Sequence, residues 1–255
     1  MEAYAPLLEK TRIPQPSLQR LAVICIFVKI RSEPSSSAGI HALNLCINSG
    51  SPAVLDQSTR ELCRLVKDSK FDLSTALLEL HSALESSSSP QSRCVFIKAI
   101  GFLVRFGFQE KPSSFRFHSS EIHPFVKILS CGAEVQCELV KQVVLFILKC
   151  KHLGMDEVCE FLGPFVNYSV VKIPVMGHSS GFTRNLISTI LALSCSFPQE
   201  AIPIVNLLTE RLKYFSCKNA EEVASISYVV ECLVDAYLVV LRQLVGLRFV
   251  RLLCH

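Results

Sequence analysis

The feature that most constrains this chain is a helical period of apolar residues that restarts every 34 to 40 residues. Each restart lies at or near the head of an apolar run, and a proline marks it: Pro16, Pro52, Pro90, Pro124, Pro164 and Pro198. Proline suits the first turn of a helix because its missing N–H would have no intrahelical partner there. Ser51 and Ser89 precede two of these prolines, so we expect both serines to act as N-caps.

One helix shows the period clearly on both of its faces. Its apolar face comprises Leu55, Ser58, Leu62 and Leu65, and its polar face comprises Asp56, Arg60, Glu61 and Arg64. The polar face predicts two helix-spaced ion pairs, Asp56 with Arg60 and Glu61 with Arg64, each worth a few tenths of a kcal/mol. A second stripe comprises Val135, Leu139, Val143, Ile147 and Cys150. Val140, Val144 and Leu148 widen this second stripe, so we expect other helices to cover its helix on two sides.

The restarts divide the chain into helix pairs joined by short polar breaks. The predicted pairs are 16–31 with 38–48, 51–68 with 72–85, 90–107 with 119–130, 133–152 with 155–167, and 182–196 with 198–214, followed by a helix at 219–247. This spacing matches HEAT and armadillo arrays, which take roughly 40 residues per repeat. We predict an all-α fold, an armadillo/HEAT-like α-solenoid of about five to six helical hairpins; a globular helical bundle is the alternative.

We expect residues 1–250 to form a single helical-repeat array, with long loops near 109–119 and 168–181. Residues 237–255 are atypical because the chain stops within an apolar periodic run, whereas arrays normally end in a polar-faced capping repeat. Our hypothesis is that this end belongs to a truncated or alternatively spliced product.

The segment Val175–Phe182 contains a G-x-S-x-G pattern centred on Ser179, the nucleophile elbow of α/β-hydrolases. Such an elbow needs a parallel sheet upstream, but residues 1–166 show helical patterns throughout. Only Asp235 and His255 could complete the triad in the family's chain order. We therefore predict no catalytic residue, and keep a serine hydrolase as the alternative. As a loop, 168–181 is long for a compact array, and such loops are often functional.

Other candidate sites are also weak. His118, Glu121 and His123 share a segment and could suggest a metal site, but we expect solvated loop residues. Phe102–Phe108 mixes aromatic residues with an arginine, as a base-stacking surface would, yet its helix spacing favours a core. The 12 cysteines form no C-x-x-C pair, and most lie in apolar runs, as Cys25 and Cys232 do. We expect buried, reduced thiols and no metal or cofactor.

Composition narrows the function classes further. The net charge is only +4 and the basic residues are scattered, so we predict no direct binding of nucleic acid. No window reaches the roughly 18 uncharged apolar residues that a membrane span needs. The N-terminus has neither signal-peptide nor transit-peptide character. We therefore expect a cytoplasmic protein, with a peripheral membrane-associated scaffold as an alternative.

Three stretches resemble a known family. Residues 7–32, 56–74 and 96–109 are similar to the beginning of focadhesin-like proteins, and the resemblance extends to about Ala236. It implies a very large, non-enzymatic armadillo/HEAT-type scaffold of which this chain is the N-terminal part. It also implies a cytoplasmic adaptor between the RNA exosome and the SKI helicase complex, linked in plants with wax production and embryo development. The resemblance supplies no catalytic residue.

Overall fold

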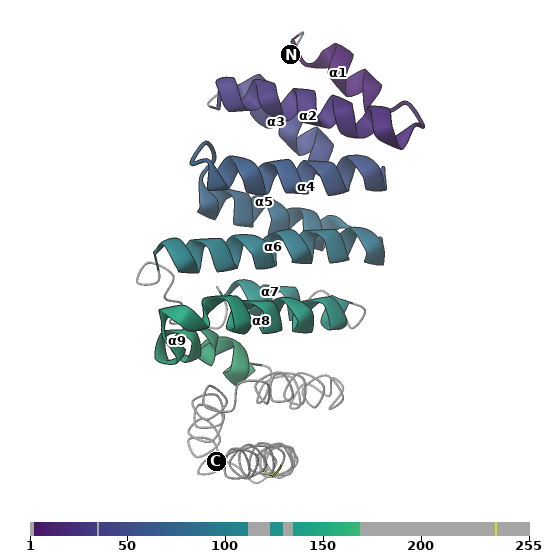
Figure 1. The fold of residues 1–255 in the computed structure, drawn as a ribbon. Helices are drawn as coiled ribbons and strands as arrows, with labels where there is room; N and C mark the ends of the chain where they lie inside the picture. Colours follow the sequence, from purple (N-terminus) through teal and green to yellow (C-terminus); the bar gives the residue numbers. More distant parts are fainter. Residues whose placement is uncertain (1–2, 35, 112–122, 130–134, 169–237, 239–255) are drawn as a thin grey trace, which may run out of the picture. The chain divides into compact units, whose positions relative to one another are not determined.

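A computed structural model describes residues 3–34, 36–111, 123–129, 135–168 and 238. Within these ranges all regular elements are helices, and no strand occurs (Figure 1). The helices are α1 (Ala5–Lys10), α2 (Pro16–Ser32), α3 (Ser37–Ile47), α4 (Pro52–Lys67), α5 (Leu73–Ser86), α6 (Pro90–Glu110), α7 (Pro124–Leu129), α8 (Gln136–Cys150), a 3-10 turn (Lys151–Leu153) and α9 (Met155–Asn167). The predicted fold class, an α-solenoid of helical hairpins, is confirmed.

The predicted helix boundaries agree with the structure to within a few residues for α2 to α6, α8 and α9. Of the predicted helix 119–130, the structure describes α7 only from residue 124. α6 continues to Glu110, so it extends into the predicted loop 109–119. The loop 168–181, the helices predicted between 182 and 247, and the atypical end lie outside the described residues, except for Tyr168 and residue 238.

The chain divides into two compact units. Unit 1 comprises Met1–Gly107 and Ile128–Gln142, and unit 2 comprises Phe108–Lys127 and Val143–His255. In unit 1, α2 contacts both α3 and α4, and α3 also contacts α4. The long helices α2, α4 and the first part of α6 form one row, and α3 and α5 form a second row (Figure 1). Within unit 1 the α2–α3 hairpin therefore packs against α4 of the next hairpin, as serial repeats require.

Four of the five marker prolines that the structure describes begin a helix, and Pro198 lies outside the described residues. Pro16, Pro52 and Pro90 are the first residues of α2, α4 and α6, which begin successive hairpins. Pro124 is also a first residue, but it starts α7, the second helix of its pair. Pro164 lies inside α9, so the prediction that it heads a helix is wrong. Proline interrupts only one hydrogen bond of a helix, and packing of the flanking turns can outweigh that loss.

The two predicted N-caps behave differently. The Ser89 hydroxyl accepts a hydrogen bond from the backbone N–H of Ser92 at 3.4 Å, as a cap of α6 should. Ser51 occupies the N-cap position of α4, but its hydroxyl donates to Gln19 Oε1 at 2.8 Å. That bond joins α4 to α2 in place of capping the helix. Asp72, which was not predicted, caps α5 by accepting from the N–H of Thr75 at 2.8 Å, and this hydrogen bond lowers the pKa of Asp72.

The described part of unit 2 has an aromatic core. Phe125 meets Phe146, Phe161 and Phe165 edge to face, with ring centroids 5.9 to 6.2 Å apart. Phe146 stacks on Phe161 at 4.6 Å. These are the favoured geometries of aromatic pairs. They fix the short helix α7 against α8 and α9.

α1 was not predicted, because six residues give too little periodic signal. It packs on α2 through its N-terminal end. Tyr4 is buried, the Lys29 ammonium lies 5.1 Å from the centroid of its ring, and the same ammonium donates to the Ala3 carbonyl at 3.0 Å. This cation–π contact anchors the start of the described chain.

Candidate functional site

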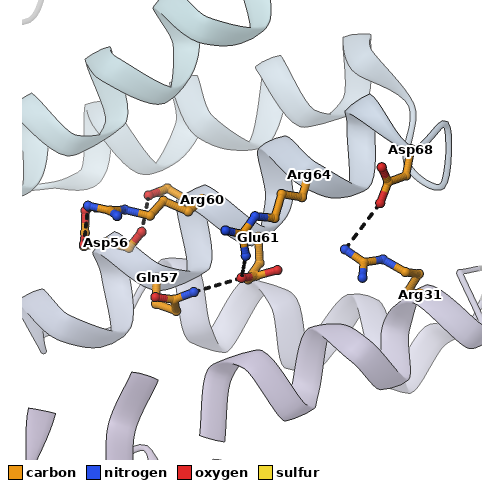
Figure 2. Close-up of polar contacts among 8 residues, drawn as sticks. Arg31, Asp56, Gln57, Arg60, Glu61, Arg64 and Asp68 are labelled. Atoms are coloured by element: carbon orange, nitrogen blue, oxygen red, sulfur yellow. Dashed lines mark hydrogen bonds and ion pairs between the residues drawn. The ribbon is translucent and has the colours of Figure 1, made fainter. Parts of the chain in front are cut away.

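A charged ridge runs along α4 (Figure 2). Its members are Asp56, Gln57, Arg60, Glu61 and Arg64, and we call this set the α4 ridge. Both predicted ion pairs are present. Arg60 bonds Asp56 twice, through Nη2–Oδ2 at 3.0 Å and Nε–Oδ1 at 3.2 Å, and Arg64 Nη1 bonds Glu61 Oε1.

Glu61 departs from the prediction because it is buried, with only 4% of its surface exposed. Its Oε1 accepts hydrogen bonds from Gln57 Nε2 at 2.8 Å and from Arg64 Nη1. A buried carboxylate requires such partners, since loss of hydration would otherwise be costly. The Arg64 side chain stays 60% exposed. The arrangement therefore fixes an outward-facing guanidinium on the surface of the array.

A third ion pair joins two hairpins at the end of this ridge. Arg31 at the end of α2 lies 3.4 Å from Asp68, the residue that follows α4 (Figure 2). Both side chains are exposed to a similar extent, so solvent screens the pair, and its contribution is about 0–1 kcal/mol.

Unit 1 also contains a groove of about 400 Å³. The groove lies where α3 and α5 end and where α4 and α6 begin. Its polar wall includes Ser49, Ser92 and the serine run 86–89, and apolar residues such as Leu55 and Phe96 line the rest. No lining residue is charged. The groove can therefore offer hydroxyl and backbone hydrogen bonds to a peptide, but its lining supplies no acid or base for catalysis.

The residues considered for a catalytic triad and for a metal site lie mostly outside the described part of the chain. Ser179, Asp235 and His255 lie outside the described residues, and so do His118 and Glu121. His123 is described, and the expectation that it is a solvated loop residue is wrong: it is fully buried. Among the described residues, no group of three or more His, Cys, Asp or Glu side chains is arranged to hold a metal ion.

His123 instead caps α7 from within the aromatic core. Its Nδ1 accepts a hydrogen bond from the N–H of Phe125 at 3.2 Å, and its Nε2 lies 3.1 Å from the Phe161 carbonyl oxygen. This pair of contacts selects the neutral tautomer with the proton on Nε2. Burial disfavours the charged ring and lowers the pKa of His123 to about 3, although the bond to Phe161 opposes the shift. The side chain is therefore a structural group and does not act as an exposed ligand.

The segment Phe102–Phe108 divides between core and surface. Leu103, Val104 and Phe108 are buried, as expected for a core helix. Phe102 is exposed and stacks on Phe106 with the rings almost parallel at 6.4 Å. Within unit 1, Arg105 does not project freely, since its Nη1 donates to Gln142 Oε1 at 2.8 Å. The core interpretation is thus correct for the inward side of α6.

Six cysteines are described as free thiols, and they differ in burial. Cys46 and Cys150 are buried, as predicted, but Cys25 and Cys137 are exposed, so the expectation of burial is wrong for these two. Burial raises the pKa of Cys46 to about 11 and that of Cys63 to about 12. Such thiols are poor nucleophiles at neutral pH.

In the part of the chain that the structure describes, no helix is both long enough and apolar enough to cross a bilayer.

Comparison with known proteins gives a family. The search of curated proteins found no match. Two solved structures are similar: a designed armadillo repeat protein (16% identity, 89% of this chain and 98% of that chain covered, TM-score 0.35) and an engineered protein from the Northeast Structural Genomics Consortium (14% identity, 92% and 98% covered, TM-score 0.34). The family model described as Focadhesin/RST1, DUF3730, matches residues 77–252, which is more than half of the chain. The chain therefore belongs to the Focadhesin/RST1 family.

Proposed function

We propose that this protein is a non-enzymatic scaffold for protein–protein interactions. The observation that carries the proposal is the division of the unit 1 side chains between a buried apolar core and a polar surface. Apolar side chains such as Ile26, Leu43 and Leu62 are buried between the helices of unit 1, while the Arg60 and Arg64 side chains of the α4 ridge and the serine-lined groove remain on the surface. Serial hairpins of this kind present extended surfaces to partners.

The binding partners that we propose are inferred from membership of the Focadhesin/RST1 family. We propose that the chain is the N-terminal part of a larger cytoplasmic adaptor, close to the plant RESURRECTION protein, that links the RNA exosome with the SKI complex. Family membership supports this assignment. The roles in wax production and plant embryo development belong to the same proposal. In it, residues 1–250 form one continuous repeat array that needs no cofactor or metal and does not bind RNA directly.

Affinity purification tests the partner assignment. The intact chain, tagged at one end, is expressed in plant cells and purified with and without RNase treatment. We expect exosome and SKI subunits among the specific proteins by mass spectrometry, and we expect them to persist after RNase. Recovery only without RNase would mean that RNA, and not the scaffold, connects the proteins, and recovery of neither complex would refute the adaptor role.

A fluorophosphonate probe tests the non-enzymatic part of the proposal. A serine hydrolase would be labelled covalently at its nucleophile. We expect the probe to leave the intact chain unlabelled at Ser179, so that the unmodified chain and the Ser179→Ala variant give the same signal. Labelling of the unmodified chain but not of this variant would refute the proposal and favour the hydrolase.

A further inference from the structure

The chain contains two Ser-Pro pairs, and they occupy equivalent places in successive repeats. Ser51 precedes Pro52, the first residue of α4, and Ser89 precedes Pro90, the first residue of α6. The sequence contains no other Ser-Pro pair and no Thr-Pro pair. A serine followed by a proline is the acceptor pattern of the proline-directed protein kinases. The sequence alone offers two equal candidates for phosphorylation, and the structure distinguishes them.

The first pair is fixed by packing within unit 1. The Ser51 hydroxyl donates to Gln19 Oε1 at 2.8 Å, and Gln19 is a buried residue of α2. The residues directly after Pro52 are buried from Ala53 to Leu55. A kinase binds its substrate in an extended form on both sides of the acceptor serine. Phosphorylation of Ser51 would therefore require the first turn of α4 to open and leave its packing.

The second pair lies at the surface. Ser89 ends the linker 87–89, which joins α5 to α6 and has no regular secondary structure. Its hydroxyl donates to Gln91 Oε1 at 3.0 Å, and this hydrogen bond is exposed. Pro90 and Gln91 are exposed as well, and the first buried residue of α6 is Phe96. Because the residue before a proline favours extended backbone, the linker is already close to the form that a kinase binds.

We propose that Ser89 is a phosphorylation site for a proline-directed serine/threonine kinase. In the transfer, Ser89 Oγ attacks the γ-phosphorus of MgATP, a P–Oγ bond forms, and the bond from that phosphorus to the β,γ-bridging oxygen breaks. ADP leaves with the bridging oxygen, and the hydroxyl proton passes to the catalytic aspartate of the kinase. This modification goes beyond the scaffold proposal and does not depend on it.

A phosphate on Ser89 would change the charge of the serine-lined groove. Ser89 belongs to the lining of that groove, in which no residue is charged, and a phosphoserine carries a charge of about −1.5 to −2 at neutral pH. Arg93 follows one helical turn later, and its Nε donates to the Ser87 carbonyl oxygen at 2.7 Å. Its guanidinium is thus directed to the linker, where it would form charge-assisted hydrogen bonds with the phosphate. Phosphorylation would therefore make the groove anionic and tie the linker to α6.

A kinase assay on the folded full chain tests the site. The probe is a recombinant mitogen-activated protein kinase with MgATP, and peptide mass spectrometry measures the rate of phosphorylation at each serine. An equimolar mixture of synthetic peptides 46–57 and 84–95 carries the same two motifs without the fold. We expect the preference for Ser89 over Ser51 to be at least about ten-fold larger in the folded chain than in the peptide mixture, because only the fold protects Ser51.

Matched variants identify what the kinase recognises. Ser89→Ala should abolish phosphorylation of the folded chain, whereas Ser51→Ala should leave it unchanged. Pro90→Ala keeps the acceptor serine and removes the proline that the kinase selects, so phosphorylation of Ser89 should slow at least about ten-fold. Circular dichroism verifies that each variant is folded before its rate is compared.

Hydrogen exchange tests the contact with Arg93. Phosphorylation of Ser89 should slow amide exchange over residues 91–94, because the phosphate fixes the first turn of α6. Arg93→Gln should remove most of that slowing and leave the rate of phosphorylation unchanged.

Three results would overturn the assignment of the acceptor. They are phosphorylation of Ser51 in the folded chain as fast as that of Ser89, transfer to serines 86–88 in place of Ser89, and no phosphate at Ser89 under conditions that phosphorylate the 84–95 peptide. Equal amide exchange before and after phosphorylation would refute the contact between the phosphate and Arg93.

Discussion

Acidification should destabilise unit 2 through one side chain, His123. The ring is fully buried, and both of its nitrogens contact backbone groups, those of Phe125 and Phe161. Protonating Nδ1 would place a second donor against the N–H of Phe125, so the folded state resists the charged form. The pKa of His123 in the folded chain is about 3, against about 6.5 in the unfolded chain.

The sign follows from which state takes up the proton. Because the folded pKa is the lower one, the unfolded chain gains the proton first as the pH falls below about 6.5, and stability is lost. From about pH 7.5 to about pH 5 the free energy of unfolding should fall by about 2 kcal/mol through this residue. This loss depends only on the folded pKa lying well below 5. By about pH 3 the loss approaches about 5 kcal/mol and then levels off.

Urea denaturation followed by circular dichroism at several pH values measures the effect. His123→Asn provides the control, because an Asn oxygen can cap α7 from the same position but does not titrate. Other groups change stability in both proteins, so the difference between their pH slopes isolates His123. An NMR titration supplies a second readout. Equal slopes in the two proteins, or a His123 resonance that titrates near pH 6.5, would refute the reasoning.

Three further predictions concern packing and thiol reactivity. Gly101→Ala should destabilise the chain by about 1–3 kcal/mol in thermal unfolding, because its Cβ would overlap the Gln142 side chain, at 2.8 Å from Cγ and 2.9 Å from Cβ. Gly50→Ala has no atom within 4 Å of its Cβ and should have little effect, so similar melting temperatures for the two variants would count against this packing. Leu62→Ala should lower the free energy of unfolding by about 2–5 kcal/mol, whereas the exposed Leu78→Ala should lower it by less than about 0.5 kcal/mol. Urea denaturation midpoints measure both losses, and equal losses would contradict the assigned core. Brief alkylation followed by peptide mass spectrometry should label exposed thiols before buried ones, and the reverse order would contradict the burial pattern. The exposed thiols are Cys25 and Cys137, and the buried ones are Cys46 and Cys150.

Periodicity predicted the helices well because each hairpin buries a local, repeating pattern. The apolar positions Leu55, Leu62 and Leu65 are buried as expected. The same pattern could not identify the inward face of α2, whose two sides are both apolar. Cys25 was therefore expected inside, although it is exposed. Leu18 and Val28 are exposed as well, and spacing alone does not say which apolar face a neighbour covers.

Polar residues that the packed array buries were the other source of error. Glu61 was placed on the polar face, yet the packed array buries it, and Gln57 and Arg64 satisfy its carboxylate. His123 was expected in solvent because its sequence neighbours suggested a loop. Its partner Phe161 lies 38 residues further along the chain, and no local sequence pattern predicts that contact. The groove was not predicted either. Its wall is formed by the ends of four helices, and a sequence pattern does not show which helix ends lie together.

The contacts of unit 1 have a mechanical consequence. Among the helices that the structure describes in unit 1, α2 makes its main contacts with α1, α3 and α4, which all lie near it in the sequence. A pulling force on residues before α2 would therefore load one hairpin interface at a time, and hairpins would detach in sequence order, with modest force at each step. Unit 1 should therefore lengthen under tension in steps of one hairpin instead of unfolding all at once.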